Sequence, residues 1–401
     1  MNHNRPRILC IPDGPDWIFN RHIEALNQYL GELFDFHTIF RFQAYDESTY
    51  DLIYPLEFDM VRQEQILNPA KYITGIRSFV SWADWNFLDL VNYVANHFQS
   101  VHVVSQQLFG IFSPYIPGLS YVTHGVDATR FSPSKQPTSE AGQLRLGWAG
   151  NRNTIVKGFR DFIEPLGDIP GVELVYHGYI DHNLPQTDMP GFYDSLDAYV
   201  SASKYEGNNN TLLEAAAMGR PIITTSNGTV PEYLVDEQSA LVVERNLDQL
   251  KAAVFRLRDD PGLRQRLGQQ ARKAILQGGW DWQVKAEEYR TFFESALSKT
   301  GNAIITAPIV QPSNYHHYAS VLEIQFDLER ELRIGYAYRA SDLNYTNKHL
   351  QEQMTTCEQE REKQKQELIA IKESRTYKLV NRLKDSTVGR WFSRIYRWFV
   401  G

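Results

Sequence analysis

Two carboxylates flank a short run of small polar residues in the middle of the chain. Glu206 and Glu214 are separated by Gly-Asn-Asn-Asn-Thr-Leu-Leu, and the residues after Thr211 have high helix propensity. Thr211 is the expected N-cap of this helix, Gly219 its C-terminal stop, and residues 222–225 a short buried strand. Free N–H groups at a helix start bind anions, phosphates above all. The segment therefore predicts a site that holds a phosphorylated ligand beside two acids.

The same residues carry a family resemblance. Glu206-x7-Glu214, with Leu-Glu-Ala before Gly-x-Pro-Ile-Ile, resembles the donor-site motif of retaining glycosyltransferases of family 4. Upstream, THGVDATRFSP at residues 123–133 resembles the connector between the two domains of that family, and GWAGNR at 147–152, followed by Lys157-Gly, resembles its first donor-domain strand and loop. The resemblance is specific over residues 120–298, weak before them, and ends near residue 300. It implies the GT-B architecture, with two Rossmann-like domains facing a cleft.

The resemblance implies roles for cations and carboxylates in a donor site. Arg152 and Lys157 would neutralise a departing diphosphate, a task that suits a forked guanidinium and an ammonium where no metal is present. Taken alone, each would sooner be interpreted as a surface cation, and the neighbouring motifs favour the diphosphate role. Glu214 would accept hydrogen bonds from ribose hydroxyls, while Thr211-x-x-Glu214 also matches a capping box. Glu206 would hold the donor sugar by its hydroxyls, the alternative being an ordinary loop carboxylate.

A glycine and a polar loop complete the expected donor site. Its further members, whose backbone would approach the sugar and the diphosphate, are Gly150, Gly207, Asn208, Asn209, Asn210 and Thr211. The family often has an aromatic and a small residue at the positions of Asn208 and Asn209. The three asparagines therefore depart from the family pattern and leave the identity of the sugar open.

Four residues near the predicted first domain's strand ends are candidates for the acceptor side. Asp13, Trp17 and His22 belong to the first loop and helix, and Asp84 follows a later strand, where it could orient an acceptor hydroxyl. Packing or helix capping explains each of the four equally well.

Three further features of the first domain bear on ligand binding. Where family members often carry a Gly-Gly loop, this chain has Asp-Gly-Pro15, and Pro15 has no N–H to offer a phosphate. His102, within a strand, and His124, in the connector, are expected to be structural.

Strands and helices alternate along the chain in two successive series. The expected strands are 7–12, 36–40, 52–54, 72–79, 101–104, 144–149, 172–177, 198–201, 222–225 and 240–243. The expected helices are 18–33, 85–97, 159–166, 189–195, 230–234, 247–258, 261–276 and 280–296. This alternation predicts an α/β fold with two doubly wound parallel sheets. The expected divisions are an acceptor domain (1–132), a donor domain (133–298), a linker (299–317), a helical or weakly coiled-coil extension (318–373) and a basic amphipathic tail (374–401).

The size and composition of the chain limit its class. A chain of 401 residues suits two domains with appendages, and its net charge of −7 argues against nucleic acid as the main partner. Cys10 and Cys357 are the two cysteines, which predicts neither a disulfide framework nor a cysteine metal site and fits a reducing cytoplasm. No signal-peptide core and no run of about 20 apolar residues is present. We therefore expect a soluble or peripheral cytoplasmic protein.

The last sixty residues contain two helical segments of different character. A heptad frame through residues 343–371 has polar seam positions, which favours a solvated helix or a weak homodimer contact through 340–373 over a strong coiled coil. Residues 372–401 hold eight basic residues against two acids, with aromatic side chains on one helical face and arginines on the other. This composition is typical of an interfacial helix drawn to anionic lipid, the alternative being a helix docked on the body of the protein. Residues 374–379, SRTYKL, also resemble a tail segment of enzymes that build bacterial surface polysaccharides.

Together these features predict a retaining glycosyltransferase that moves a sugar from a nucleotide-diphosphate donor to a hydroxyl of a glycan or glycolipid, in surface polysaccharide synthesis at the inner face of a membrane. Neither a metal nor another cofactor is expected. The alternatives are a sugar-nucleotide epimerase or phosphorylase of the same fold and a non-catalytic, membrane-associated scaffold.

Overall fold

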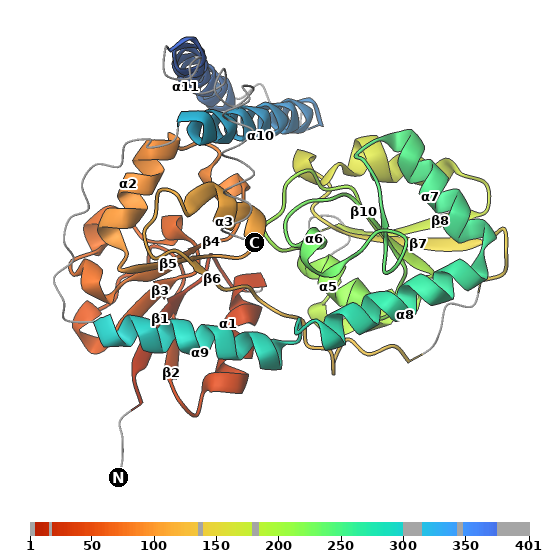
Figure 1. Ribbon diagram of the computed structural model, residues 1–401, viewed down its shortest axis with the longest axis horizontal. Coiled ribbons are helices and arrows are strands. Elements are labelled where there is room, and N and C mark those ends of the chain that lie inside the picture. The colour runs from red at the N-terminus through yellow and green to blue at the C-terminus, as the bar shows by residue number, and fades with distance from the viewer. Residues whose placement is uncertain are drawn as a thin grey trace, which may run out of the picture. The chain divides into compact units, whose positions relative to one another are not determined.

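The computed structural model describes residues 5–15, 18–134, 139–178, 184–299, 315–342 and 348–374 (Figure 1). The chain separates into two compact units, one of residues 1–82 with 90–308 and one of residues 83–89 with 309–401. Trp17, most of the predicted linker and nearly all of the predicted tail lie outside the described residues.

The first unit begins with an amino lobe built on parallel strands. These are β1 (Arg7–Ile11), β2 (Asp35–Thr38), β3 (Leu52–Pro55), β4 (Ile73–Ile76), β5 (Ser100–Val103) and β6 (Ser120–Tyr121). They pair in the orders β2-β1-β3 and β4-β5-β6, and a bridge between Ile53 and Tyr72 joins the two sets. Ile8, Leu9 and Cys10 of β1 are fully buried, as expected for a parallel strand covered on both faces.

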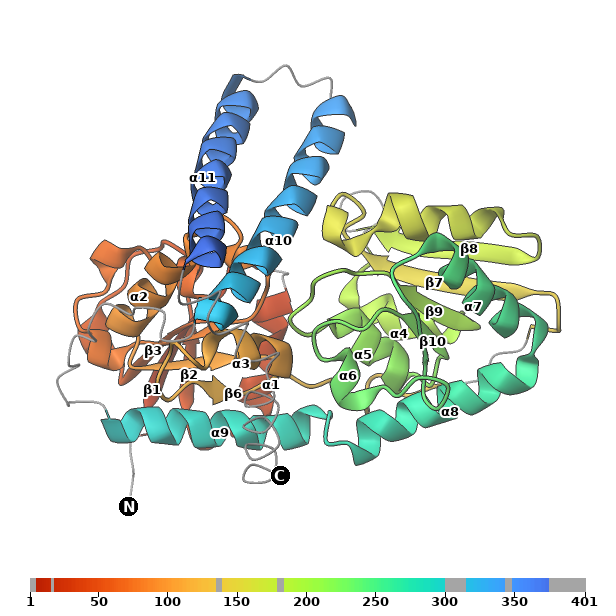
Figure 2. The ribbon, with the colours of Figure 1, turned by 45° about the horizontal axis from the view of Figure 1, so that its top comes forward.

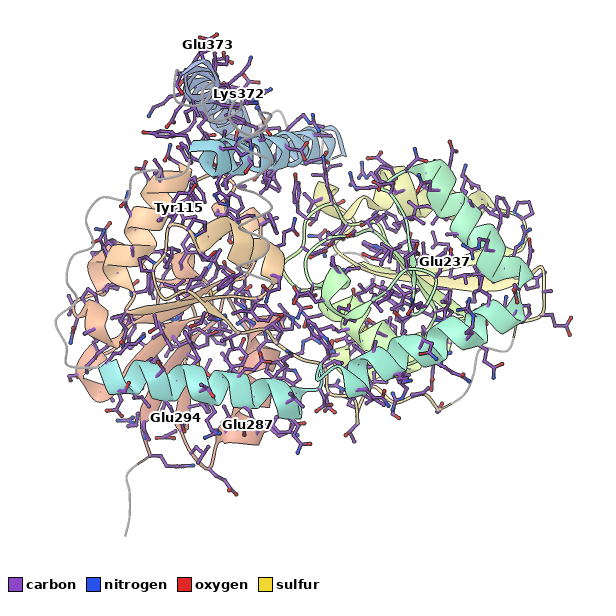
Figure 3. All side chains as sticks on the ribbon, in the orientation of Figure 1. Tyr115, Glu237, Glu287, Glu294, Lys372 and Glu373 are labelled. Carbon is purple, nitrogen blue, oxygen red and sulfur yellow. The ribbon has the colours of Figure 1, made fainter. Side chains whose placement is uncertain are left out.

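The amino lobe's sheet is covered by helices from both ends of this unit. They are α1 (Ile18–Leu30), α2 (Phe87–His97), α3 (Gln106–Phe112) and α9 (Trp282–Lys299). The Phe293 ring of α9 lies 5.6 Å from Phe34 and 5.7 Å from Tyr54, while Arg290 pairs with Glu287 and Glu294 on the outer face of α9 (Figure 3). Helix α9, predicted as the end of the donor domain, therefore packs on the amino lobe. Helical periodicity alone does not indicate that the chain returns to this lobe.

The carboxyl lobe is a five-stranded parallel sheet with helices on both faces. Its strands are β7 (Leu144–Gly150), β8 (Val172–Gly178), β9 (Ala198–Ser201), β10 (Ile222–Thr224) and β11 (Leu241–Val242), in the order β11-β10-β9-β7-β8. Its helices are α4 (Met189–Asp194), α5 (Asn210–Ala217), α6 (Val230–Tyr233), α7 (Leu247–Asp259) and α8 (Pro261–Gln277).

Alternate residues of the central strands enter two separate hydrophobic cores of the carboxyl lobe. Tyr199 and Ile222 belong to the core that contains residues of α4, α5 and α8, whereas Val200 and Ile223 belong to the core that contains residues of α7. Side chains of a strand point alternately to its two faces, so both faces of this sheet are buried. The predicted doubly wound architecture is confirmed.

Local differences from the predicted elements have local causes. In place of a helix over 159–166, Phe159–Ile163 forms a π turn and Glu164–Asp168 a 3₁₀ turn, because Pro165 cannot donate a helical hydrogen bond. The sequence patterns did not predict α3 or the two-residue β6. Short 3₁₀ turns occupy Glu47–Thr49, Phe58–Met60, Gln63–Gln65, Pro69–Lys71, Val80–Trp82, Ile155–Lys157 and Gln186–Asp188.

The second unit contains a pair of long helices, α10 (Tyr315–Asp342) and α11 (Lys348–Glu373), which run side by side (Figure 2). Tyr318 donates to Glu367 at 3.0 Å, and Arg333 lies 3.5 Å from Glu358, so the two helices are antiparallel. The described end of the predicted heptad seam, from Gln364 to Ile371, is buried within this chain. None of the described helices is long and apolar enough to cross a membrane.

Candidate active site

The loops that carry the predicted donor residues leave the sheet of the carboxyl lobe at its topological switch point. β8, the next strand in sequence, lies on one side of β7, and β9 lies on the other side. The strand order therefore reverses between β7 and β9. Loops that leave such a point diverge and form a crevice in which open α/β sheets bind ligands. Gly150 is the last residue of β7, Arg152 and Lys157 follow that strand, and Glu206 follows β9.

The structure joins these two loops through an ion pair. Lys157 Nζ lies 2.7 Å from Glu206 Oε1, and Ser203 Oγ donates to the same carboxylate oxygen at 2.8 Å. A Cβ on Gly150 would lie 3.2 Å from Lys157 Cδ, so the glycine lets the lysine stem lie close to the strand end. Arg152 is half-buried in the turn before Lys157. Of the two predicted cations, Lys157 therefore meets Glu206 directly at the switch point.

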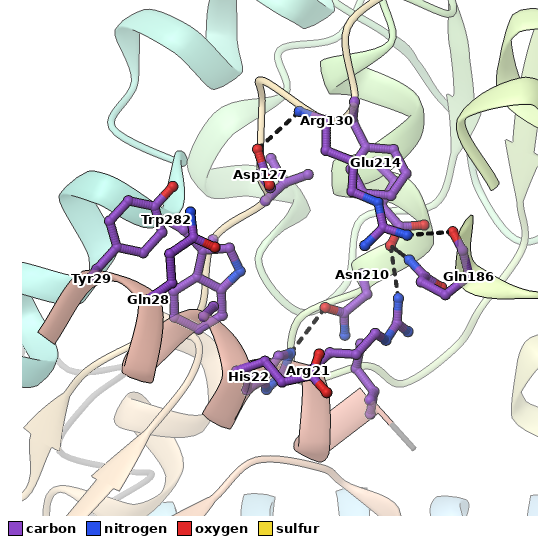
Figure 4. Close-up of a pocket in the computed structure, with 16 residues that line it drawn as sticks. Arg21, His22, Gln28, Tyr29, Asp127, Arg130, Gln186, Asn210, Glu214 and Trp282 are labelled. Atoms are coloured by element: carbon purple, nitrogen blue, oxygen red, sulfur yellow. Dashed lines mark hydrogen bonds and ion pairs between the residues drawn. The ribbon is translucent and has the colours of Figure 1, made fainter. Parts of the chain in front are cut away.

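Glu214 is buried on α5 and accepts three polar contacts. Tyr193 Oη donates to its Oε2 at 2.8 Å, Gln186 Nε2 to its Oε1 at 3.1 Å, and Arg21 Nη1 lies 3.4 Å from Oε1 (Figure 4). Burial raises the pKa of Glu214, and the charge of Arg21 opposes this rise. Arg21 belongs to the amino lobe, so Glu214 is a contact between the lobes.

The predicted capping box is wrong. Asn209 caps α5, because its Oδ1 accepts from Leu212 N at 3.3 Å and from Thr211 Oγ1 at 2.9 Å. Thr211 lies inside the helix, and its hydroxyl also accepts from Tyr199 Oη at 2.8 Å. Because the helix starts two residues earlier than predicted, Glu214 does not close its own helix end. Its carboxylate faces the cleft instead.

The three asparagines have three different environments. Asn208 is buried, with its Nδ2 donating to Thr123 Oγ1 at 2.9 Å and to His124 O at 3.0 Å, and its Oδ1 accepting from Thr229 Oγ1 at 2.7 Å. All its hydrogen-bonding groups are therefore used inside the protein. Asn209 is the helix cap. Asn210 is the asparagine whose side chain lines the pocket.

A pocket lies between the lobes of the first unit, next to the start of α5 (Figure 4). It is lined by Ile18, Arg21, His22, Glu24, Ala25, Gln28, Tyr29, Gly125, Val126, Asp127, Arg130, Phe131, Gln186, Asn210, Glu214 and Trp282. Among the predicted residues, His22, Asn210 and Glu214 therefore share one pocket. Arg130 Nη2 donates to Gln186 O at 2.6 Å, which ties the connector to the loop before α4.

Two acceptor-side candidates lie elsewhere. Asp13 follows β1, where burial raises its pKa and the charge of Arg41 opposes the rise, but it does not line the pocket. Asp84 belongs to the second unit, in which its charge acts on Glu329. Trp17 lies outside the described residues.

The chain passes between the two lobes twice, once in the connector and once just before α9. Backbone hydrogen bonds join these two segments. Val126 N donates to Trp280 O at 2.9 Å, and Trp282 N donates to Val126 O at 3.1 Å. A Cβ on Gly125 would lie 2.8 Å from backbone atoms of residues 280–282, so only glycine allows this approach. The connector predicted from its Gly-Val-Asp pattern therefore sits beside the start of α9.

Sequence reasoning missed Arg21, Arg77, Arg130, Gln186 and Trp282. A signal existed for the first, because Ile18, Arg21, His22, Ala25, Gln28 and Tyr29 recur at the spacing of one helical face. No local pattern marks Arg77, which comes from the loop after β4 and reaches the site only through the fold.

His102 is structural, as predicted. Its Nε2 lies 2.7 Å from Tyr54 Oη and its Nδ1 2.9 Å from Val122 O, and burial together with the charge of Arg77 lowers its pKa to about 3. His124 is buried and stacks on His22 with ring centroids 4.2 Å apart. Across the described residues, no group of three or more His, Cys, Asp or Glu side chains is arranged to hold a metal ion.

Comparison with known proteins identifies the region that contains Glu206, Glu214 and the three asparagines. Residues 178–274 match the family model described as glycosyl transferases group 1. Glycogen synthase of Mycobacterium tuberculosis is 27% identical over 212 residues, which are 46% of this chain and 50% of that protein. The GDP-mannose-dependent monoacylated alpha-(1-6)-phosphatidylinositol monomannoside mannosyltransferase of Corynebacterium glutamicum is 22% identical over 217 residues, 45% of this chain and 57% of that protein. The chain thus spans about half the length of these curated relatives.

The fold has solved counterparts. The structure of Anabaena HepE in complex with UDP and glucose superposes with a TM-score of 0.57 at 13% identity, and covers 73% of this chain and 100% of that one. At this identity the likeness shows the fold alone, which is α/β with parallel sheets in the GT-B architecture. The chain is therefore a GT-B protein whose carboxyl lobe contains a region matching glycosyl transferases group 1.

Proposed function

We propose that this chain is a retaining glycosyltransferase that transfers a sugar from a nucleoside-diphosphate sugar to a hydroxyl of a glycan or glycolipid. The observation that carries the proposal is the pairing of Lys157 with Glu206, at 2.7 Å, in the crevice between β7 and β9. A diphosphate needs cations and a donor sugar needs hydrogen-bond acceptors, and both are supplied there from adjacent loops.

Each residue of the site has a distinct part in the proposed reaction. The bond between the anomeric carbon and the diphosphate oxygen breaks, a bond from that carbon to the acceptor oxygen forms, and the hydroxyl proton passes to the departing diphosphate. Lys157, Arg152 and the free N–H groups at the start of α5 neutralise the charge that develops on the diphosphate, so that no metal is required. Glu206 holds the sugar hydroxyls, and Glu214 accepts from the ribose hydroxyls.

The relatives support the choice of substrates. The mannosyltransferase of C. glutamicum is named for its dependence on GDP-mannose, and HepE was solved with UDP and glucose. HepE was also solved with UDP-glucose, which is a nucleoside-diphosphate sugar like GDP-mannose. The named acceptor of the mannosyltransferase is a lipid, in line with a glycan or glycolipid acceptor and a role in surface polysaccharide synthesis.

The basic, aromatic tail of residues 374–401 provides a reason for such a protein to lie at the inner face of a membrane, because arginines and aromatic side chains together favour an anionic lipid surface. The proposal also includes a weak homodimer contact through residues 340–373. Within that range, the seam positions from Gln364 to Ile371 are already buried inside the chain.

The test is to incubate the protein with a panel of nucleotide sugars, with and without extracted glycolipid acceptor, and to measure release of the nucleoside diphosphate. We expect release that depends on acceptor and is abolished in Glu206→Ala with an unchanged melting temperature. Full activity of this variant would contradict the proposal. Conversion of the sugar nucleotide without acceptor would indicate the epimerase, and absence of any turnover or nucleotide binding would favour the scaffold.

A further inference from the structure

Arg77, His22 and Asn210 form a chain of hydrogen bonds that runs from the amino lobe to the first residue of α5. Arg77 Nη2 lies 2.7 Å from His22 Nδ1. His22 Nε2 lies 3.2 Å from Asn210 Oδ1, a contact that Figure 4 shows. Arg77 and His22 are both buried, with 5% and 3% of their surface exposed. The hydrogen bond between Arg77 and His22 is therefore shielded from competing water.

The arginine determines which nitrogen of His22 carries the proton. A guanidinium can only donate, so His22 Nδ1 must be the acceptor, and the proton of the neutral ring resides on Nε2. His22 Nε2–H then donates to Asn210 Oδ1. Burial, with the neighbouring His124 and the charges of Arg77 and Arg21, holds the pKa of His22 well below its usual range, which keeps this neutral tautomer in place.

The direction of these hydrogen bonds determines the orientation of the Asn210 amide. With Oδ1 held by His22, the NH₂ group occupies the other branch of the planar amide. Asn210 Nδ2 has no hydrogen-bond partner among the described residues, and Asn210 lines the pocket. Asn210 therefore presents a donor, rather than an acceptor, to a ligand in this pocket.

Asn210 and Glu214 are one helical turn apart on α5 and line the same pocket, as residues i and i+4 do on one helix face. The site thus offers a donor at the helix start and an acceptor about 6 Å further along the axis. A nucleoside diphosphate has the complementary pattern, with phosphate oxygens that accept and ribose hydroxyls that donate. This match follows from side chains that the two lobes bring together.

Arg77 is itself fixed against the donor loop. Its backbone N donates to Glu57 Oε1 at 2.9 Å, and its guanidinium lies over the Phe19 ring, 5.0 Å from the centroid. A Cβ on Gly207 would come within 1.8 Å of Arg77 O, so the donor loop rests directly on the backbone of Arg77. One residue therefore holds the donor loop by its backbone and orients Asn210 through its side chain.

We propose that Arg77 and His22 are positioning residues that turn the amide N–H of Asn210 toward a phosphate oxygen of the bound nucleoside diphosphate. The inference rests on the proposed function, because it needs the nucleotide to occupy the pocket beside Glu214. It assigns Asn210, one of the three asparagines that depart from the family pattern, a specific role. It also makes α1 of the amino lobe, which carries His22, part of nucleotide recognition.

The test is titration calorimetry with UDP, GDP and ADP on the full chain, using the nucleotide that wild-type protein binds most tightly. Asn210→Leu removes both branches of the amide. Asn210→Asp keeps an oxygen for His22 but replaces the donor by an acceptor. His22→Ala removes the link, whereas His22→Gln restores a donor near the position of Nε2. Melting temperatures verify that each variant is folded, and Asn27→Ala, an exposed change on the same helix, is the matched control.

We expect both Asn210 variants to bind the nucleotide about tenfold or more weakly, His22→Ala to bind it several-fold more weakly, and His22→Gln to recover most of the loss. A purely structural tie between the lobes predicts wild-type affinity for Asn210→Asp, and that result would overturn the proposal. Equal affinity of His22→Ala and wild type would overturn it as well. If wild-type protein binds none of the three nucleotides, the proposed function itself fails, and this inference fails with it.

Discussion

Lys157 Nζ lies 2.7 Å from Glu206 Oε1, so the cation expected to bind a diphosphate is paired with the carboxylate expected to bind the sugar. Both side chains are mostly buried, with 26% and 16% exposed. A diphosphate that approaches Lys157 must therefore compete with Glu206.

Glu206→Gln tests this competition. The amide keeps the shape of the side chain but loses its charge, so Lys157 is freed for the ligand. We expect affinity for a nucleoside diphosphate to rise by up to about fivefold, the scale of a partly exposed ion pair, while sugar transfer is lost. Calorimetry measures the first and product release the second. Glu173→Gln, which removes the exposed partner of Arg145, is the control. An affinity that is unchanged or lower would show that the pair does not compete.

Gly207→Ala probes the contact between the donor loop and the amino lobe. An added Cβ would lie 1.8 Å from Arg77 O and 2.9 Å from Val104 Cγ2, so the loop or the loop after β4 must move. Overpacking of this kind costs about 1–3 kcal/mol. We expect a lower midpoint of urea unfolding and weaker nucleotide binding.

Gly191→Ala on α4 is the matched control for that change, because nothing lies within 4 Å of its added Cβ. It should be neutral or slightly stabilising, since alanine favours a helix over glycine. Equal effects of the two substitutions would contradict the close contact at Gly207.

Glu57 predicts a pH dependence of stability with a definite sign. Burial raises its pKa to about 8, above the ordinary value of 4.5. The native state therefore holds a proton that the unfolded chain has released, and stability falls as the pH rises from about 4.5 to about 8, by up to about 1.4 kcal/mol per pH unit. Glu57→Gln lacks this loss and keeps an oxygen for Arg77 N.

The measurement is urea unfolding of both proteins at several pH values, with the difference in unfolding free energy as readout. Using the difference is necessary because the lowered pKa of His102, about 3, makes stability rise with pH below about 6.5 and opposes the effect of Glu57. We expect Glu57→Gln to gain stability relative to wild type as the pH rises. A difference independent of pH would show that Glu57 ionises normally in the native state.

Removal of residues 374–401 tests the proposed membrane association. We expect wild-type protein to sediment with vesicles of phosphatidylglycerol and phosphatidylcholine, less at high salt because charges on the tail are screened, and the truncated protein to stay in solution. Vesicles of phosphatidylcholine alone are the control for charge. Undiminished sedimentation of the truncated chain would place any membrane contact elsewhere.

The sequence by itself indicates most of the secondary structure and the two loops that meet at the switch point between β7 and β9. Continuous apolar runs such as β1, helix stops such as Gly219 and the spacing of Glu206 and Glu214 are local patterns, and each appears in the structure near its predicted place. Local patterns also misled, at residues 159–166 and at the start of α5. Thr211 precedes a strong helix former, yet Asn209 caps α5, because an asparagine two residues earlier competes for the same N–H groups.

The tertiary structure decided which of these residues face one another. Asn208, Asn209 and Asn210 are identical in chemistry and adjacent in sequence, but one is buried under the connector, one caps a helix, and one meets His22 of the other lobe. Arg21 lies 193 residues before its partner Glu214 in the sequence. Arg77 lies 55 residues after its partner His22. Propensity and periodicity act over a few residues, whereas a hydrogen bond between lobes depends on how two sheets and their crossings pack. For this reason the residue types of the site could be predicted from the sequence, and their partners could not.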